Sequence, residues 1–280
     1  MATMGRDSEI RDFIESLLIQ DYKDFELIIV DQNDDSRVAR LYDFYKEMIP
    51  IQYFRSTVKG LSYNRNIGLK YITGNIVAFP DDDCEYDRDT LQKVAYFFDN
   101  SQNFDFYTCN TKEKHGNRAV VNSNKSDCVI SLSNFLKVGI SFAIFIRAEA
   151  IHNFSFDEKL GVGTEFGSGE ESDMLLYLIK NNHKGYYNSK EYIFHPFKEE
   201  TLERLFEYGK GYGAIHKKAI EYYGFYSIIF RCILLLITGI IRIVMHPFSK
   251  AARVKLQGRI MGFKKYKIIN NKTGVSIPIN

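Results

Sequence analysis

Three consecutive carboxylates, Asp81, Asp82 and Asp83, are the residues whose types and spacing point most clearly to chemistry. They follow the apolar run of residues 75–79 and a proline, so we expect them at the carboxyl end of a buried strand. Adjacent carboxylates repel one another, and keeping several of them ionised requires a bound cation or a well-solvated site. Magnesium or manganese is usually held by one or two carboxylates and by substrate phosphates, which indicates a nucleotide diphosphate as the second ligand. The alternative is an acidic turn that caps a helix beginning near Asp89.

The composition is that of an ordinary folded enzyme. The 280 residues are 45% hydrophobic and 26% charged, which predicts one main domain with an appendage. None of the four cysteines belongs to a Cys-x-x-Cys pair, so neither a zinc knuckle nor a disulfide framework is indicated and a reducing compartment fits. The first residues lack the apolar core of a signal peptide, so we expect the globular part to be cytoplasmic.

Charge is distributed unevenly along the chain. From Gly224 onward there are ten Lys or Arg residues and no Asp or Glu, whereas the preceding residues hold 27 basic and 35 acidic side chains. An acidic body therefore carries a basic tail. Nucleic acid is not expected as a partner, because the tail lacks regular aromatic interleaving and any recognisable nucleic-acid motif.

The tail contains an apolar segment, residues 226–245, whose only charged residues are Arg231 and Arg242. These arginines and Thr238 share one stripe of a helical wheel, so we expect a helix that lies in the plane of a membrane interface rather than a simple span. The basic residues that follow can meet anionic lipid on the cytoplasmic leaflet; they are Lys250, Arg253, Lys255, Arg259, Lys264, Lys265 and Lys267. The alternative is a helix packed on the protein body.

Strands and helices alternate in the first part of the chain. Periodicity predicts helices that begin at Asp7 or Ser8 and end at Gln20, and that cover residues 38–48 and 62–73. It predicts strands over residues 25–30, 51–54 and 76–79. This alternation indicates a parallel sheet with crossovers, in which ligands bind outside the carboxyl ends of the strands. Asp31 and the three aspartates follow such ends.

The order of these motifs resembles family 2 glycosyltransferases. The strand that ends at Asp31 is followed by residues 60–68, Gly-Leu-Ser-Tyr-Asn-Arg-Asn-Ile-Gly, and by the Phe-Pro-Asp-Asp-Asp of residues 79–83. Downstream, residues 156–163 and residues 167–174, Gly-Ser-Gly-Glu-Glu-Ser-Asp-Met, look like the acceptor-side segment of bacterial members that build surface polysaccharides. The resemblance covers roughly residues 1–215.

The resemblance implies an α/β GT-A fold, a Rossmann-like mixed sheet with helices on both faces, over residues 1–215. Residues 216–280 are then expected to form a membrane-associated helical tail. The implied activity is a metal-dependent transfer, with Mg²⁺ or Mn²⁺ and with inversion, of a sugar from a nucleotide-diphosphate donor, expected to be a UDP-sugar. The implied acceptor is a hydroxyl of a glycan or a lipid-linked molecule in capsule, O-antigen or related synthesis, with the enzyme peripheral at the inner face of the cell membrane.

Two other functional classes stay open. One is a catalytically weak or inactive nucleotide-binding scaffold of a polysaccharide-synthesis complex. The other is a nucleotidyltransferase, which lacks the support of a Gly-rich phosphate loop with an adjacent lysine. A processive synthase is not expected, because it needs several membrane spans.

Carried over residue by residue, the resemblance assigns a donor site. Asp31 is expected to contact the nucleobase, and Thr3 and Arg6 lie where the first nucleotide-binding loop belongs. Arg65 matches the arginine of the family's Ala-Arg-Asn segment, with Asn64 in the usual alanine position. Arg65 is expected to hold the base or a phosphate, or else to form a surface salt bridge.

The metal site is assigned in the same way. Asp81 and Asp83 match the outer carboxylates of the DXD motif, with Asp83 as the metal ligand and Asp81 as the ribose contact and second metal ligand. Asp82 is expected to assist either one. His195 resembles a histidine that follows the acidic helix in many GT-A enzymes, where it reaches the metal or diphosphate; the alternative is a structural histidine.

Transfer to a hydroxyl also needs a base, because a hydroxyl is a poor nucleophile near neutral pH. Glu171 aligns with the aspartate of the family's Glu-Asp motif, so a longer side chain stands at the position usually assigned as base. Glu170 and Asp173 are the alternative bases, unless all three merely enrich the first turn of a helix. The glycines at positions 161, 163, 167 and 169 predict a mobile loop that closes over the substrates.

Family members begin with an apolar strand just before the nucleotide-binding loop, whereas this chain starts at Met1-Ala2-Thr3. Most of this central strand is therefore expected to be absent, which exposes neighbouring apolar edges. We expect translation to begin upstream, and a chain that starts at Met1 to have weak stability or little activity.

Overall fold

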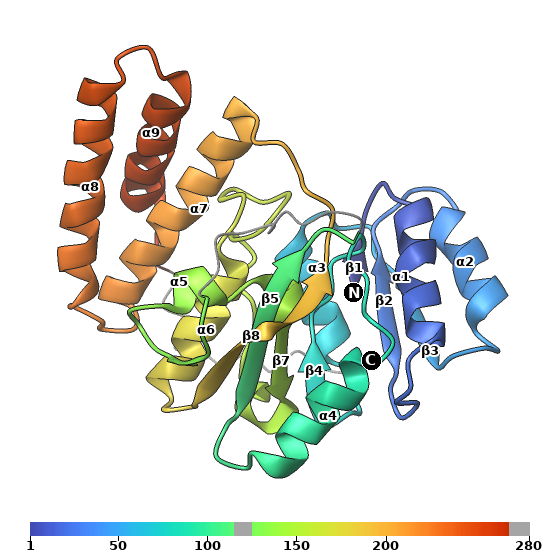
Figure 1. The fold of residues 1–280 in the computed structure, drawn as a ribbon. Helices are drawn as coiled ribbons and strands as arrows, with labels where there is room; N and C mark the ends of the chain where they lie inside the picture. Colours follow the sequence, from blue (N-terminus) through green and yellow to red (C-terminus); the bar gives the residue numbers. More distant parts are fainter. Residues whose placement is uncertain (115–124, 269–280) are drawn as a thin grey trace.

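Three parallel strands form the first sheet. The computed structural model describes residues 1–114 and 125–268. The sheet has the order β1-β2-β3, with β1 (Ala2–Thr3), β2 (Leu27–Asp31) and β3 (Ile51–Arg55) (Figure 1). All five residues of β2 are buried, as expected for a strand that helices cover on both faces.

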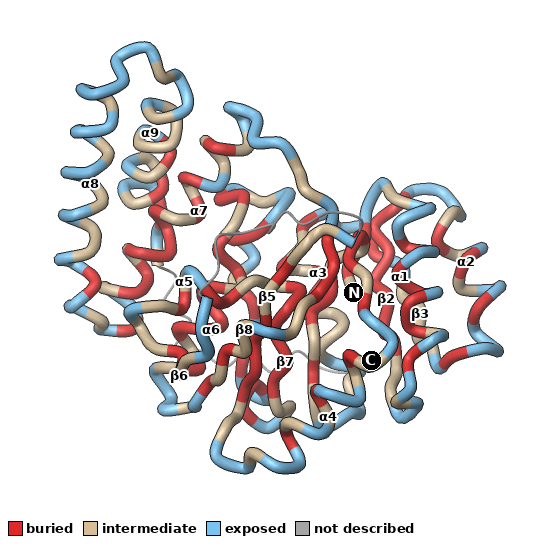
Figure 2. The backbone as a smooth tube through the Cα atoms, in the orientation of Figure 1, coloured by how far each residue is buried: buried red, intermediate tan, exposed pale blue. Residues whose placement is uncertain are grey.

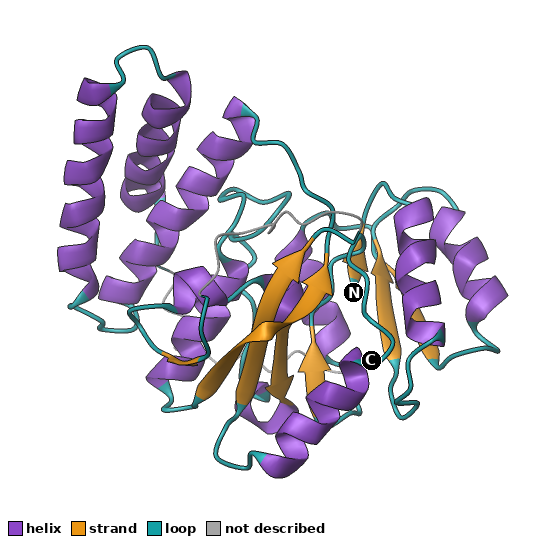
Figure 3. Ribbon diagram, in the orientation of Figure 1, coloured by secondary structure: helices purple, strands orange, loops and turns teal. Residues whose placement is uncertain are grey.

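The second sheet is mixed and has the order β4-β7-β5-β8-β6. Its strands are β4 (Ile76–Ala78), β7 (Ile144–Arg147), β5 (Phe106–Lys112), β8 (Gly185–Phe194) and β6 (Cys128–Ile130). β7 runs antiparallel to both of its neighbours, β4 and β5, whereas β8 runs parallel to β5. This arrangement, with helices around the strands, confirms the predicted mixed α/β class (Figure 3).

A cavity of about 770 Å³ separates β2 from β4. Its lining includes Ile28 and Val30 of β2 and Val77 and Phe79 from the other side. Among the described strands, β1 pairs only with β2, and it does so over two residues. The three strands that were predicted to form one parallel sheet are therefore divided between two sheets: β2 and β3 pair in parallel, whereas β4 belongs to the second sheet and runs antiparallel to β7. The weak stability expected of a chain that starts at Met1 stays a prediction.

Helices cover the strands close to where periodicity placed them. The helices of the body are α1 (Ser8–Leu18), α2 (Arg37–Tyr45), α3 (Leu61–Leu69), α4 (Thr90–Asn100), α5 (Phe135–Val138) and α6 (Glu170–Lys180). The core has two parts, and β7 contributes to both: Ile144 and Ile146 face one cluster, and Phe145 faces the other. This is the two-residue alternation of a strand buried on both faces, and the buried segments concentrate along these central strands (Figure 2).

Three helices of the C-terminal part form a layer at one end of the molecule: α7 (Leu202–Glu221), α8 (Ile228–Met245) and α9 (Lys250–Lys265) (Figure 1). α8 is long and apolar enough to cross a membrane, with a mean hydropathy of 2.5, and 6% of it is buried. The domain boundary predicted at residue 215 stays a prediction, and α7 crosses that position without a break.

Glycine faces bring α7 and α9 close together. Gly209 and Gly213 on α7 lie against Gly258 and Gly262 on α9, so each helix presents two glycines one turn apart. A Cβ atom on Gly262 would lie 1.9 Å from the backbone oxygen of Lys210. Such small-residue contacts let helix backbones approach closely.

Gly262→Ala is therefore expected to destabilise the protein, because the added methyl group forces α9 away from α7. Overpacking of this kind costs about 2 kcal/mol. Thermal melting followed by circular dichroism measures the effect, with Gln257→Ala, at an exposed position of the same helix, as the control. Equal melting temperatures for the two variants would show that the glycine contact is not tight.

Candidate active site

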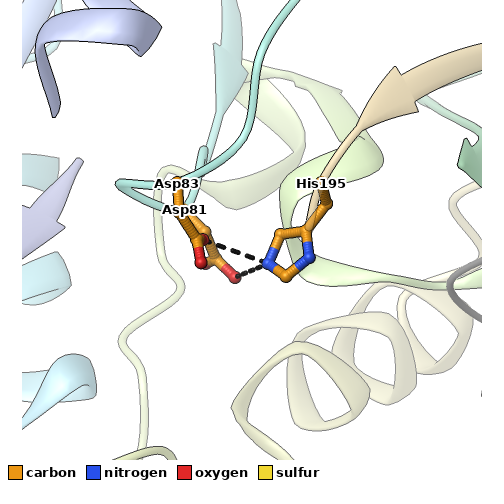
Figure 4. A group of neighbouring side chains, drawn as sticks. All are labelled: Asp81, Asp83 and His195. Atoms are coloured by element: carbon orange, nitrogen blue, oxygen red, sulfur yellow. Dashed lines mark ion pairs between the residues drawn. The ribbon is translucent and has the colours of Figure 1, made fainter. Parts of the chain in front are cut away.

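The carboxylate cluster lies just beyond β4, facing the end of β8. Asp83 Oδ1 is 3.1 Å from His195 Nε2, and Asp81 Oδ2 is 3.9 Å from the same nitrogen (Figure 4). A backbone bridge holds the two segments together, because Glu85 and Phe194 exchange hydrogen bonds of 2.9 and 3.0 Å. The His195 ring stacks on Phe142 at a centroid distance of 4.4 Å. The structure thus brings together the three residues assigned as metal ligands.

The donor atoms of this cluster fit a divalent cation. His195 Nδ1 lies 2.7 Å from the carbonyl oxygen of Pro196, which can only accept, so Nδ1 carries a proton and Nε2 is the ring nitrogen that faces the aspartates. Asp83 Oδ1 is buried, and within residues 1–114 and 125–268 it accepts no hydrogen bond of regular geometry. One ligand atom from each of Asp81, Asp83 and His195 lies within 4.8 Å of the others. Two carboxylate oxygens and one imidazole nitrogen are suitable ligands for Mn²⁺.

The surroundings shift the pKa values of Asp83 and Asp82 in opposite directions. Burial works against ionisation of Asp83, but His195 and the ammonium of Lys198, 2.6 Å away, bring the pKa of Asp83 well below its usual range. Burial raises the pKa of Asp82, against the hydrogen bond from Thr3 Oγ1 at 2.6 Å and the Arg6 ion pair at 3.0 Å. The sequence analysis did not identify Lys198 as a site residue, and the one feature that could have indicated it is its position three residues after His195.

The residues that the sequence assigned to the nucleotide lie at the first two strand ends. Thr3 ends β1, and its partner in register is Asp31 at the end of β2. Arg6, in the following loop, pairs with Asp82 and also with Asp83. Asp31 is buried and accepts hydrogen bonds from the Tyr53 hydroxyl at 2.8 Å and from both nitrogens of Asn33. The sequence predicted Asp31, but Tyr53 and Asn33 gave no signal beyond their nearness to strand ends.

Arg65 connects the carboxylate cluster with the acidic helix. Its guanidinium lies 3.3 Å from Asp81, 3.2 Å from Glu170 and 2.8 Å from the hydroxyl of Ser141. The side chain is buried and packs over the rings of Phe79 and Phe156. Arg65 therefore forms salt bridges in the interior rather than at the surface, between two groups that the sequence assigned to different roles.

The three acidic residues of α6 differ in their surroundings. Both oxygens of Asp173 are occupied, one by Lys218 Nζ at 2.8 Å and the other by the Tyr223 hydroxyl at 2.9 Å. Glu170 pairs with Arg65. Glu171 has no cation within ion-pair distance among the described residues, and Ser172 donates to it at 3.3 Å.

Burial, followed by the charge of Glu170, raises the pKa of Glu171 to about 8. A carboxyl with such a pKa is better matched to a hydroxyl proton near neutral pH than an exposed glutamate is. Glu171 is thus the acid of α6 whose environment best suits a base. Tyr208 of α7 lies close enough to Glu171 for the glutamate's charge to contribute to a raised pKa of the tyrosine. The sequence analysis did not identify Tyr208.

The glycine-rich loop before α6 adopts backbone conformations that favour glycine. Gly161, Gly163 and Gly169 have φ values of 104°, 78° and 100°. The loop contacts α3, because Leu61 N donates to the Val162 carbonyl at 3.1 Å and Ser62 Oγ donates to the Leu160 carbonyl. The loop therefore connects α3, which carries Arg65, with the acidic helix α6. Its predicted mobility stays a prediction.

Comparison with known sequences places the chain in a family. The model of glycosyl transferase family 2 matches residues 1–154, more than half of the chain. The GalNAc(5)-diNAcBac-PP-undecaprenol beta-1,3-glucosyltransferase of Campylobacter jejuni is 28% identical over an alignment of 210 residues, which covers 71% of this chain and 64% of that protein. The minor teichoic acid biosynthesis protein GgaB of Bacillus subtilis is 27% identical over 65% of this chain and 21% of its own length. The chain thus spans less than two thirds of these relatives.

Solved structures share the fold. The S. aureus TarS 1-349 complex with UDP-GlcNAc superposes with a TM-score of 0.60 at 18% identity, covering 79% of this chain and 65% of that one. The mannosyltransferase PcManGT from Pyrobaculum calidifontis, in complex with GDP-Man and Mn²⁺, superposes with a TM-score of 0.65 at 13% identity, covering 93% and 85%. These likenesses confirm the GT-A fold. With this fold and the match over more than half of its length, the chain belongs to glycosyl transferase family 2.

Proposed function

We propose that this chain moves a sugar, with inversion, from a nucleotide-diphosphate donor to a hydroxyl of a glycan or lipid-linked acceptor in surface polysaccharide synthesis. The observation that carries the proposal is the convergence of Asp81, Asp83 and His195 on one point, with Arg65 linking Asp81 to the helix that bears Glu171. Similar proteins support it: one is a glucosyltransferase with a PP-undecaprenol acceptor, and another forms a complex with UDP-GlcNAc. A UDP-sugar is the donor that we propose.

The donor half of the site handles negative charge. Asp83, Asp81 and His195 are the residues that would hold Mg²⁺ or Mn²⁺. A divalent cation there neutralises the charge that develops on the departing nucleotide diphosphate. Lys198 and Arg6 add positive charge beside the same carboxylates. Asp31, Thr3 and the Arg6 loop then bind the nucleotide, and Arg65 fixes the orientation of Asp81.

The acceptor half supplies the base. Ionised Glu171 takes the proton of the acceptor hydroxyl as it attacks the anomeric carbon from the face opposite the leaving group. Glu170, paired with Arg65, keeps α6 beside the carboxylate cluster. Asp173 anchors α6 to α7 through Lys218, which places it in a supporting role.

The helical layer supports a peripheral location on the cytoplasmic face of the membrane. The outward side of α8 is apolar, and its exposed side chains include Phe230, Ile237, Ile241 and Val244. Arg231 turns instead toward the body, where it donates to the carbonyls of Leu132 and Ser133. α8 is thus fixed to the protein along one side, which favours a helix lying on the membrane.

The scaffold alternative draws on one observation, the cavity between β2 and β4 beneath the nucleotide side of the site. A cavity beneath the proposed nucleotide site is expected to weaken nucleotide binding relative to a closely packed sheet. Turnover of a sugar nucleotide distinguishes the two functions, because a scaffold releases no nucleoside diphosphate.

Metal binding tests the cluster without any reaction. The wild-type protein is expected to bind Mn²⁺ in the presence of UDP, and Asp83→Asn is expected to weaken this binding about tenfold or more, because it removes the ionised ligand. Electron paramagnetic resonance of free Mn²⁺ measures the affinity. Asp87→Asn, which removes an exposed carboxylate four residues away, is the control. Equal affinities of the two variants would place the metal elsewhere.

Turnover tests the proposed reaction. The protein is expected to release nucleoside diphosphate from one member of a panel of UDP-, dTDP- and GDP-sugars with Mn²⁺ and a membrane extract as acceptor. Glu171→Gln is expected to slow this release by about 100-fold or more, because the amide cannot take a proton. Glu203→Gln, an exposed first-turn glutamate of α7, is the matched control. Release that Glu171→Gln leaves at the wild-type rate would contradict the role of Glu171.

The pH dependence follows from the raised pKa of Glu171, whose charge Glu170, Arg65 and Tyr208 also influence. Because only the ionised carboxylate is a base, kcat/KM is expected to rise by about tenfold per pH unit below pH 8 and to level off above it. Glu171→Asp, which restores the family's residue, is expected to keep a rising profile, whereas Glu171→Gln loses it. A wild-type profile that is flat from pH 6 to 9 would contradict this assignment.

A further inference from the structure

A pocket of about 210 Å³ lies between α7, α8 and α9. Most of its lining is apolar, with Leu235 and Leu236 from α8 and Leu256 and Phe263 from α9. The pocket is remote in sequence from the carboxylate cluster, and no residue of the proposed active site lines it. A ligand of this pocket would therefore bind at a site separate from the proposed active site.

The pocket contains a cation that lacks a counter-ion. Arg259 lines it, and no carboxylate of the described residues lies within ion-pair distance of the guanidinium. The guanidinium lies 4.7 Å from the centre of the Tyr212 ring, and its buried Nε has no hydrogen-bond partner in the part of the chain that the structure describes. Burial lowers the pKa of Arg259. A desolvated charge without a partner is costly, so this arrangement suits an anionic ligand.

A second polar atom in the pocket also lacks a partner. His216 is 4% exposed, and its Nδ1 donates to the Tyr212 carbonyl at 2.7 Å. The proton therefore lies on Nδ1, and Nε2 has a lone pair to which none of the described residues donates a hydrogen bond. The ligand that satisfies both groups carries an anionic oxygen for Arg259 and a hydroxyl for His216.

The surroundings of the pocket indicate an amphiphile rather than a free anion. The outer side of α8 is apolar, and Phe248, just after it, is 95% exposed. Lys264 adds a second cation to the lining, and the chain has no acidic residue from Gly224 onward to repel an anion. A long apolar chain can thus lie among the leucines while its phosphate meets the cations.

We propose that the pocket between α7, α8 and α9 binds one phosphate-bearing membrane lipid, whose chain packs against Leu235 and Leu256 and whose phosphate contacts Arg259 and Lys264. This inference goes beyond the general attraction of a basic tail to a membrane, because it assigns one lipid to one pocket. It does not depend on the transferase activity. The phosphate-bearing lipid has a net negative charge and is either an anionic bilayer phospholipid or a polyprenyl phosphate carrier, so zwitterionic phosphatidylcholine is the control.

Flotation with vesicles of defined composition tests the proposal on the full chain. The vesicles are phosphatidylcholine alone, phosphatidylcholine with phosphatidylglycerol, and phosphatidylcholine with the same charge supplied by polyprenyl phosphate. Arg259→Met is expected to weaken binding to the vesicles that contain phosphatidylglycerol or polyprenyl phosphate by about tenfold to 100-fold, because a charged hydrogen bond is lost. Lys265→Met, which removes one exposed charge from the same helix, is expected to weaken it by about fivefold, the effect of surface attraction alone.

A second variant keeps every cation. Cys232→Phe places a ring in the pocket from α8, so it is expected to weaken binding as Arg259→Met does, whereas surface attraction predicts no change. Circular dichroism melting confirms that each variant is folded, and Arg259→Lys is expected to restore part of the binding. Loss of binding to the phosphatidylglycerol vesicles, to the polyprenyl phosphate vesicles or to both supports the pocket, and the vesicles affected show which lipids it accepts. Equal effects of Arg259→Met and Lys265→Met with no effect of Cys232→Phe, or displacement by millimolar inorganic phosphate, would overturn it.

Discussion

The repulsion among the carboxylates beyond β4 is the constraint on which the rest of the structure depends. Asp81, Asp82 and Asp83 lie side by side in a partly buried turn, where water cannot screen them fully. Cations from three other regions form ion pairs with these aspartates: Arg6 after β1, Arg65 of α3 and Lys198 after β8. These ion pairs therefore hold the loop after β1, the acidic helix α6 and the end of β8 around the aspartates.

This arrangement links the two halves of the proposed reaction. Arg65 contacts Asp81 in the donor half and Glu170 in the acceptor half, although Arg65 and Glu170 are 105 residues apart in sequence. α6 is held from its other side as well, since Lys218 joins Asp173 to Asp157 and Asp157 also contacts Tyr266 after α9. The acidic helix α6 thus lies between the carboxylate cluster and the helical layer, with Glu170 held by Arg65 and Asp173 held by Lys218.

Local patterns made the fold and part of the site predictable from the sequence. Asp31 and the aspartate triplet follow short apolar runs, so their place at strand ends could be inferred from periodicity, and the family resemblance added His195, Arg65 and the acidic helix. Contacts between distant segments could not be predicted in this way. The antiparallel insertion of β7 between β4 and β5, and the approach of Lys198 to Asp83, depend on how strands pair. The packing of Asp173 against Lys218 depends likewise on where α7 lies.

The account's central claim is that Asp81, Asp83 and His195 together hold the divalent cation that binds the donor diphosphate. Anomalous X-ray diffraction from crystals grown with Mn²⁺ and UDP tests it most directly, because the manganese signal locates the ion without assumptions about activity. The account predicts one peak within coordination distance of a carboxylate oxygen of Asp83 and of His195 Nε2, next to the UDP phosphates. Bound UDP with no manganese among these side chains, or with manganese elsewhere in the molecule, would contradict it.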